Sequence, residues 1–138
     1  MLVVTNQACI ARGLLTPESL DEIHSRMLAE AARAGGRIDG VFACPHGWND
    51  GCPCRKPAPG LLFAAQREWA LDLSKTWFCG DEDRDREAAA AAGCRFLPVD
   101  NTWPLDQAAE RLTSPAHAQP QDNAWLNPGE PEWLSASF

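Results

Sequence analysis

The sequence predicts an α/β fold in which a parallel sheet carries helices on its faces. Short apolar runs alternate along the chain with segments whose apolar residues keep helical spacing, and this alternation is typical of strand–helix–strand units. Capping residues and glycines mark where the helical segments begin and end. The chain has 138 residues, a length typical of one domain. Hydrophobic residues make up 45% of it, which is enough for a core.

Four apolar runs are expected to form strands. The first, Leu2 to Thr5, has the β-rich composition of a buried parallel strand. The second, residues 40–44, leads into a loop rich in cysteine. The third, residues 76–79, is closed by Gly80 and Asp81, and the fourth spans residues 94–99.

Helices are expected between and after these strands. A helix is predicted to start at Thr16, which can act as N-cap and is followed by Pro17 and acidic residues in the first turn. Its end is predicted at Gly35 and Gly36. Apolar spacing predicts further helices over residues 59–73, 85–92 and 105–112, with Gly93 ending the Ala-rich one.

The last part of the chain differs in composition. Residues 114–138 contain four prolines, three acids and no Lys or Arg, which predicts a flexible tail behind a domain of residues 1–113. Trp125 and Trp133 leave two alternatives open: they dock on the domain or a partner, or they are exposed in a disordered segment.

The net charge of −7 argues against nucleic acid as a partner, because an acidic protein repels a phosphate backbone. No apolar run approaches the roughly 18 residues that span a bilayer. The first residues do not form a secretory signal, so we expect a cytoplasmic protein in a reducing compartment. We also expect the protein to be a monomer. An anionic substrate requires local cations, and the candidates are Arg12, Arg55 and Lys56.

Four possible metal ligands are grouped in one loop: Cys44, His46, Cys52 and Cys54. Three thiolates and one imidazole suit tetrahedral zinc in a closed structural site, because no position is left for water. The alternative is that these cysteines form disulfides or are free thiols. The cysteines outside the loop are expected to be small buried side chains, and they are Cys9, Cys79 and Cys94.

Three polar segments follow predicted strands, and ligands of parallel α/β sheets gather at the carboxyl ends of strands. Thr5, Asn6 and Gln7 can hold a phosphate oxygen. Arg55 and Lys56 supply positive charge behind the metal loop. The acidic run 80–85 suits magnesium, although a solvated helix N-terminus would have the same composition.

Together these segments resemble the haloacid dehalogenase (HAD) superfamily of phosphatases. The resemblance is strongest to the group of subfamily IIIA that dephosphorylates D-glycero-D-manno-heptose 1,7-bisphosphate and histidinol phosphate. Residues 3–13, read VVTNQACIARG, are similar to the second motif of the group. Residues 44–60 are similar to its zinc loop and third motif, and residues 80–85 to its fourth motif. The resemblance covers about residues 2–112.

The resemblance implies roles for individual residues. Thr5 and Asn6 would bind the transferring phosphoryl group, Lys56 would be the third-motif lysine, and Arg55 would contact substrate. Asp81, with Asp85, would hold magnesium, so that Lys56 and Asp81 would be the catalytic pair. The remaining candidates for phosphate binding, taken from the residues alone, are Gln7 and Arg12.

One departure from the family concerns its first motif, D-x-D on the first strand, whose first Asp is the nucleophile. No D-x-D precedes Thr5 in this sequence. Since the family orders its sheet 5-4-1-2-3, we expect a Rossmann-like sheet without its central strand, left as two half-sheets. We expect that the missing strand with its D-x-D motif is encoded upstream of Met1, or that the gene is truncated.

Three functions follow from these observations. The first is a magnesium-dependent sugar-phosphate phosphatase of the heptose-bisphosphate type, impaired as this short chain because covalent phosphoryl transfer needs the missing nucleophile. The second is a histidinol-phosphate phosphatase. The third is a non-catalytic, zinc-stabilised phosphate-binding module. The small partner is in each case a phosphomonoester.

Overall fold

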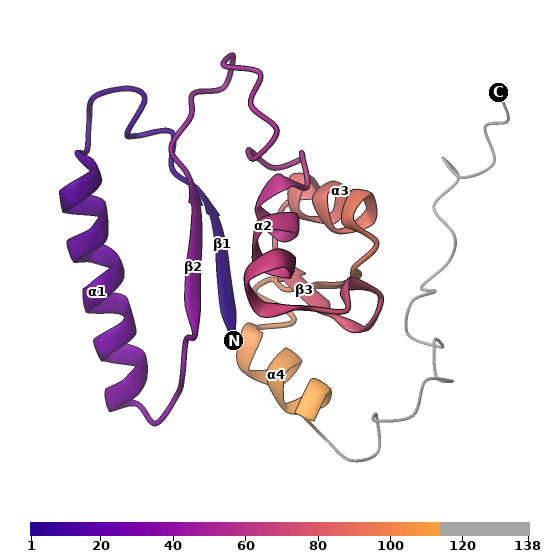
Figure 1. Cartoon of the computed structure of the whole chain (residues 1–138). Helices are drawn as coiled ribbons and strands as arrows, with labels where there is room; N and C mark the ends of the chain where they lie inside the picture. The colour runs from indigo at the N-terminus through magenta and orange to yellow at the C-terminus, as the bar shows by residue number, and fades with distance from the viewer. Residues whose placement is uncertain (114–138) are drawn as a thin grey trace, which may run out of the picture. The chain divides into compact units, whose positions relative to one another are not determined.

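The computed structural model describes residues 1–113 (Figure 1). Residues Met1–Pro98 form one compact unit, and the last helix belongs to a second unit that starts at Val99. The elements in chain order are β1 (Leu2–Asn6), α1 (Pro17–Arg33), β2 (Gly40–Cys44), α2 (Gly60–Trp69), a 3-10 turn (Leu73–Lys75), β3 (Trp77–Gly80), α3 (Asp83–Ala92), β4 (Arg95–Pro98) and α4 (Leu105–Thr113).

The four strands form two separate parallel pairs among residues 1–113. β1 pairs with β2 so that Thr5 lies opposite Ala43, and β3 pairs with β4 so that Cys79 lies opposite Leu97. This confirms the predicted α/β fold and its two half-sheets. Because both pairs are parallel, the polar residues that follow β1 and β2 emerge at the same edge of their sheet.

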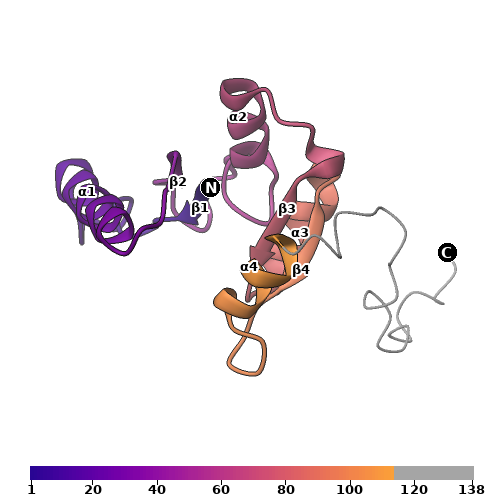
Figure 2. The same cartoon turned by 90° about the horizontal axis from the view of Figure 1, so that it is seen from below.

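Helix α1 lies on one side of the β1–β2 pair and α2 lies on the other, as Figures 1 and 2 show from two directions. Thr16 caps α1 as predicted, since its hydroxyl oxygen accepts a hydrogen bond of 3.1 Å from the N–H of Ser19. Leu20 is buried, whereas Ile23 remains 53% exposed. A pair of strands about 4.8 Å apart is narrower than a helix of about 10 Å, so it cannot cover the whole apolar face.

Helix α2 is shorter than predicted, because it ends at Trp69 rather than at Leu73. Ala70 adopts a left-handed conformation with φ of 50°, and the N–H of Leu71 turns back to the carbonyl of Gln66. The chain then forms the separate 3-10 turn, which is capped by the carboxylate of Asp72. Apolar spacing continued through this stop, so the sequence pattern alone did not reveal it.

Helix α3 begins two residues earlier than predicted, at Asp83. Glu82 and Asp85 form a capping box, in which each side chain accepts a hydrogen bond from the other residue's backbone N–H. Gly93 ends the helix with φ of 72°, as expected of a left-handed C-cap. The buried face of α3 is made of small side chains, so the helix can approach the β3–β4 pair closely; its members are Ala88, Ala89 and Ala92.

The core of the first unit is centred on α2 and α3. Leu62, Leu73, Ala88 and Ala92 form a buried cluster. Half-buried apolar side chains from both half-sheets pack against this cluster, among them Val4 of β1 and Phe78 of β3. One apolar cluster therefore supports both strand pairs, and burying each large side chain contributes about 1.5–3 kcal/mol.

Two expectations remain as predictions. The boundary after residue 113 is not tested, although the compact packing already divides the chain at Pro98. The expected tail, with Trp125 and Trp133, lies outside the described residues. In the part of the chain that the structure describes, no helix has the length and apolar character needed to cross a membrane.

We predict that Leu62→Ala lowers the free energy of unfolding by about 2–5 kcal/mol, because it leaves a cavity in the cluster that supports both strand pairs. Urea unfolding followed by circular dichroism measures this change. Leu14→Ala is the matched control, since Leu14 is 66% exposed, and it should change stability by no more than about 0.5 kcal/mol. Equal effects of the two substitutions would contradict this account of the core.

Candidate functional site

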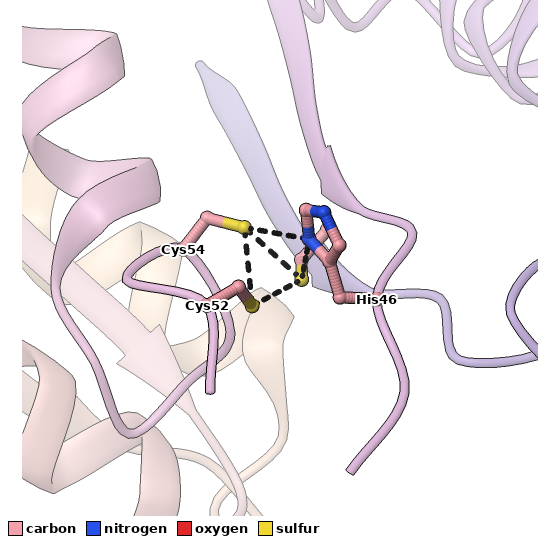
Figure 3. Close-up of side chains that lie close together, drawn as sticks. His46, Cys52 and Cys54 are labelled. Carbon is pink, nitrogen blue, oxygen red and sulfur yellow. Dashed lines mark hydrogen bonds between the residues drawn. The ribbon is translucent and has the colours of Figure 1, made fainter. Parts of the chain in front are cut away.

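The four predicted metal ligands converge at the carboxyl end of β2. One donor atom from each of Cys44, His46, Cys52 and Cys54 lies within 4.8 Å of all the others. The sulfur of Cys54 is 3.3 Å from that of Cys44 and 3.5 Å from that of Cys52, and Nδ1 of His46 is 3.2 Å from Cys54. Figure 3 shows the imidazole and the thiols pointing toward one another.

These distances suit a tetrahedral zinc ion. Zn–S bonds of about 2.3 Å in a tetrahedron place the sulfurs about 3.8 Å apart, close to the separations found here. All six cysteines of the chain are free, so the alternative of disulfides is wrong. The cysteines outside the loop, Cys9, Cys79 and Cys94, are half-buried rather than buried as predicted. Burial raises the pKa of the Cys79 and Cys94 thiols.

The thiols of the cluster do not share one acidity. Burial, together with hydrogen bonds to Cys44 and Cys52, raises the pKa of Cys54 to about 12. Desolvation also acts to raise the pKa of Cys52, but hydrogen bonds from Cys54 and from the backbone of Arg55 outweigh it and lower that pKa to about 7. A divalent cation between these sulfurs would deprotonate them outright, so metal and protons compete for the cluster.

Two hydrogen bonds fix the loop that carries the ligands, one within it and one at its exit. Asp50 accepts a hydrogen bond of 2.7 Å from the N–H of Gly47, which closes the turn between the two ligand pairs. The N–H of Gly60, at the start of α2, donates to the carbonyl of Pro53 at 3.0 Å. A Cβ on Gly60 would lie 2.3 Å from that carbonyl oxygen, so only glycine permits this approach.

Arg55 is held against the same loop. Its Nη1 donates to the carbonyl oxygen of His46 at 3.3 Å, and its guanidinium lies over the ring of Trp48 at 5.7 Å. Trp48 is 73% exposed. Trp48 was not predicted as a site residue. The signal for it in the sequence is an aromatic side chain within a ligand loop that ends in a cation.

The backbone of Lys56 is held by the side chain of Asn6. The carboxamide oxygen of Asn6 accepts a hydrogen bond of 3.0 Å from the N–H of Lys56, and its nitrogen donates to the carbonyl of Lys56 at 3.1 Å. These bonds join residues 50 positions apart in the chain. They connect the end of β1 to the exit of the metal loop, so two of the predicted segments meet.

The ammonium group of Lys56 reaches the other half-sheet. Nζ lies 2.6 Å from Oδ1 of Asp85, donates to the carbonyl of Val4 at 3.2 Å, and lies 5.6 Å from the centre of the Phe78 ring. The side chains of Lys56 and Asp85 are only 12% and 6% exposed. One buried cation therefore bridges β1, β3 and the first turn of α3.

Thr5 and Gln7, the neighbours of Asn6 in the sequence, are joined by a hydrogen bond between their side chains. The amide nitrogen of Gln7 donates to the hydroxyl oxygen of Thr5 at 2.9 Å, which leaves the Thr5 hydroxyl proton able to donate to a ligand. The amide oxygen of Gln7 accepts from the thiol of Cys9 at 3.4 Å. Arg12 lies in the same loop with an exposed side chain.

The acidic run after β3 is mostly neutralised by neighbouring cations. Glu82 pairs with Arg84, Asp83 pairs with Arg86 at 3.1 Å, and Asp85 pairs with Lys56. Within residues 1–113, this leaves Asp81 as the exposed carboxylate of the run that has no cationic partner.

The structure thus joins Asn6, Lys56 and Asp85 directly, and places Arg55 beside Lys56. In the described part of the chain, no hydrogen bond or ion pair joins Arg12 or Asp81 to this group. Their predicted roles stay predictions. Asp81 does follow β3 immediately, at the strand's carboxyl end, where the fold gathers ligands.

Comparisons with known proteins agree with this architecture. The chain is 45% identical over 94 residues to a D-glycero-β-D-manno-heptose-1,7-bisphosphate 7-phosphatase of Bordetella bronchiseptica, which covers 68% of this chain and 52% of that protein. It is 44% identical over 97 residues to the enzyme of the same name from Pseudomonas aeruginosa, covering 70% and 54%. The chain therefore spans about half the length of the curated relatives it matches.

A solved structure shows the same fold. The crystal structure of D,D-heptose 1,7-bisphosphate phosphatase from B. bronchiseptica, complexed with magnesium and phosphate, superimposes with a TM-score of 0.70 at 40% identity. The superposition covers 79% of this chain and 61% of that one. The model of the HAD-hydrolase-like family matches residues 53–121, which is half of the chain. On its sequence, its fold and the order of its motifs, the chain belongs to the HAD-hydrolase-like family.

Proposed function

We propose that this chain forms most of the active site of a magnesium-dependent phosphomonoesterase acting on a D,D-heptose 1,7-bisphosphate. The observation that carries the proposal is the contact of Lys56 with Asn6 and Asp85, because it unites three segments that resemble family motifs. The similarity to phosphatases with this substrate supports the choice of sugar.

Lys56 is proposed to neutralise the charge that develops on the transferring phosphoryl group. Its buried position supports this role, since a cation acts most strongly where water is excluded. The hydroxyl of Thr5 would donate to a phosphate oxygen, with Gln7 orienting it. Arg55 and Arg12 would contact the anionic substrate from the metal loop and the β1 loop.

Asp81 is proposed to hold magnesium. A single free carboxylate at a strand end, together with water and substrate phosphate, is the kind of ligand set that magnesium accepts. When bound, magnesium would supply further positive charge next to the phosphoryl oxygens. Asn6 and Asp85 would serve the site through Lys56.

The nucleophilic carboxylate is proposed to come from a D-x-D segment on a strand placed against β1. Within residues 1–113, β1 pairs only with β2 and β3 only with β4, so each has an edge that can accept another strand. The Lys56 ammonium lies between these two strands, on Val4 and Phe78. A carboxylate arriving there would meet a cation already in place.

The four-ligand cluster is proposed to bind zinc in a structural role. Its donor set leaves no position open for water, so zinc would shape the loop rather than take part in the reaction. Arg55 is bonded to the carbonyl of the ligand His46. The metal would therefore hold the substrate-contacting arginine in position.

We predict that the chain alone releases little phosphate from heptose 1,7-bisphosphate, and that an extended chain carrying a preceding apolar strand with D-x-D releases it in a magnesium-dependent reaction. In the extended chain, Lys56→Ala and Asp81→Asn should each lower kcat/KM by about 100- to 1000-fold, because each removes charge stabilisation of the transition state. Malachite-green detection of phosphate measures the rates.

The matched control for Lys56 is Lys75→Ala, since Lys75 is the chain's other lysine and its side chain is 78% exposed. This variant should keep the activity of the extended chain. Rapid turnover by the short chain, lost in Asp81→Asn, would show that another carboxylate is the nucleophile and would contradict the proposal.

We also predict that the purified chain contains about one tightly held zinc ion, because three thiolates and an imidazole form a complete tetrahedral set. Cys54→Ser should lose the metal and lower the melting temperature, as should prolonged chelation of the unaltered chain. Elemental analysis by plasma mass spectrometry and thermal unfolding test this.

Cys94→Ser is the matched control, because Cys94 is a half-buried thiol outside the loop. It should retain the zinc. Equal zinc content in the Cys54→Ser and unaltered chains would argue against the proposed site.

A further inference from the structure

The carboxamide of Asn6 is engaged with the backbone of Lys56 in this structure. Its carboxamide oxygen accepts from the N–H of Lys56 and its nitrogen donates to the carbonyl of the same residue, at 3.0 and 3.1 Å. The side chain thus pairs with both backbone groups of one residue, in the manner of a strand neighbour. This geometry fixes the backbone of Lys56 and commits one donor and one acceptor of the carboxamide to it.

Both carboxylate oxygens of Asp85 also contact groups of the protein. One carboxylate oxygen lies 2.6 Å from Nζ of Lys56, and the other accepts from the N–H of Glu82 at 3.3 Å. The carboxylate is almost completely buried. A Cβ on Gly80 would lie 2.5 Å from the Cβ of Asp85, so the end of β3 is packed directly on this side chain.

We propose that Asn6 and Asp85 are positioning residues that hold Lys56 from its two ends, and that neither one is itself a ligand of phosphate or magnesium. Asn6 fixes the peptide of Lys56, and Asp85 fixes the ammonium group. The inference rests on the proposed function of Lys56. It assigns the phosphate contact at the end of β1 to Thr5, and the magnesium contact at the end of β3 to Asp81.

The chemistry of the two side chains supports this assignment. A buried lysine needs a partner that satisfies its charge, and removing one member of a buried pair leaves the other uncompensated. A long, flexible side chain also has many rotamers to lose, so holding both its backbone and its head group orders it before a ligand arrives. Asp81, by contrast, is exposed and has no cationic partner among residues 1–113.

The chain is well suited to a labelling experiment, because it has two lysines and they differ in burial. Brief acetylation with isotopic acetic anhydride, read by mass spectrometry, gives the rate of Lys56 relative to Lys75, which serves as an internal reference. In the unaltered chain Lys56 should react more slowly. Asn6→Ala and Asp85→Asn should each raise the Lys56-to-Lys75 ratio by about three- to tenfold, the factor that the loss of one or two hydrogen bonds supplies.

Matched controls exist for both substitutions. Asn49→Ala removes an exposed carboxamide, and Asp83→Asn neutralises a carboxylate of the same helical turn that pairs with Arg86 instead. Both should leave the ratio unchanged. Asn6→Asp keeps the shape and the acceptor but loses the donor to the Lys56 carbonyl, so it should raise the ratio less than Asn6→Ala does.

Circular dichroism checks that each variant is folded. If Asn6→Ala does not fold, Asn6→Asp decides. If neither folds, hydrogen exchange of the Lys56 amide in the unaltered chain decides: slow exchange supports the Asn6 contact, and exchange at the rate of a free peptide overturns it. A ratio that stays unchanged in the folded Asn6 and Asp85 variants also overturns the proposal.

A double-mutant cycle then separates positioning from direct binding. Titration with inorganic phosphate in the presence of magnesium gives the Kd of the chain with Lys56 and of Lys56→Met, each with and without Asn6→Ala. We expect Asn6→Ala to weaken phosphate binding about three- to tenfold in the first background and not at all in the second, since its effect passes through Lys56. Equal weakening in both backgrounds would mean that Asn6 contacts phosphate and would overturn the proposal.

The magnesium part is tested in the same way, with magnesium alone as the titrant. Asp81→Asn should weaken binding, whereas Asp85→Asn should not, and equal losses would make Asp85 a ligand. Failure of the unaltered chain to bind phosphate or magnesium would contradict the proposed function. The labelling ratios would still decide whether Asn6 and Asp85 hold Lys56, so the two failures are distinguishable.

Discussion

The anchoring of Lys56 is the constraint on which the rest of the site depends. The two strand pairs of the first unit share no backbone ladder within the described residues. The apolar cluster around Leu62 links them, and so does the side chain of Lys56, whose backbone is bonded to Asn6 and whose ammonium group pairs with Asp85. The position of β1 relative to α3 therefore depends on a charge that must stay paired.

Several local features of the structure help to hold the ammonium group of Lys56 in place. Gly80 is required because Asp85 packs on it, and Asp85 sits at the third position of α3 because the capping box with Glu82 starts the helix there. The metal loop ends at Lys56, and the close approach of Gly60 to Pro53 fixes the start of α2 behind it. A shift of any of these segments would move the ammonium group away from its partners.

The sequence predicted most of this fold because its signals are local. Thr16 capped its helix, Gly93 ended its helix, and the four ligands of the metal loop converged, since capping residues and ligand spacing act over a few positions. The early stop of α2 was not predicted, because a left-handed Ala70 follows from tertiary packing rather than from propensity.

The predicted roles of the site residues stay predictions, and the structure adds contacts that the sequence did not reveal. The order of motifs brought Asn6 and Lys56 to one edge of the sheet, as expected. That Asn6 pairs with a backbone and that Asp85 takes the lysine could not be read from the sequence, because both contacts join residues far apart in the chain. The type of a residue shows which contacts its side chain can make, whereas only the fold shows which other residue it contacts.

The most direct test of this account is a crystal structure of the chain grown with zinc, magnesium and tungstate, an oxyanion that mimics phosphate and is located by its anomalous scattering. We expect tungstate within hydrogen-bond distance of Thr5 and Lys56, with Lys56 still bonded to Asn6 and with zinc between the four loop ligands. Tungstate bound elsewhere, or a Lys56 released from Asn6 while the oxyanion contacts the Asn6 carboxamide, would contradict it.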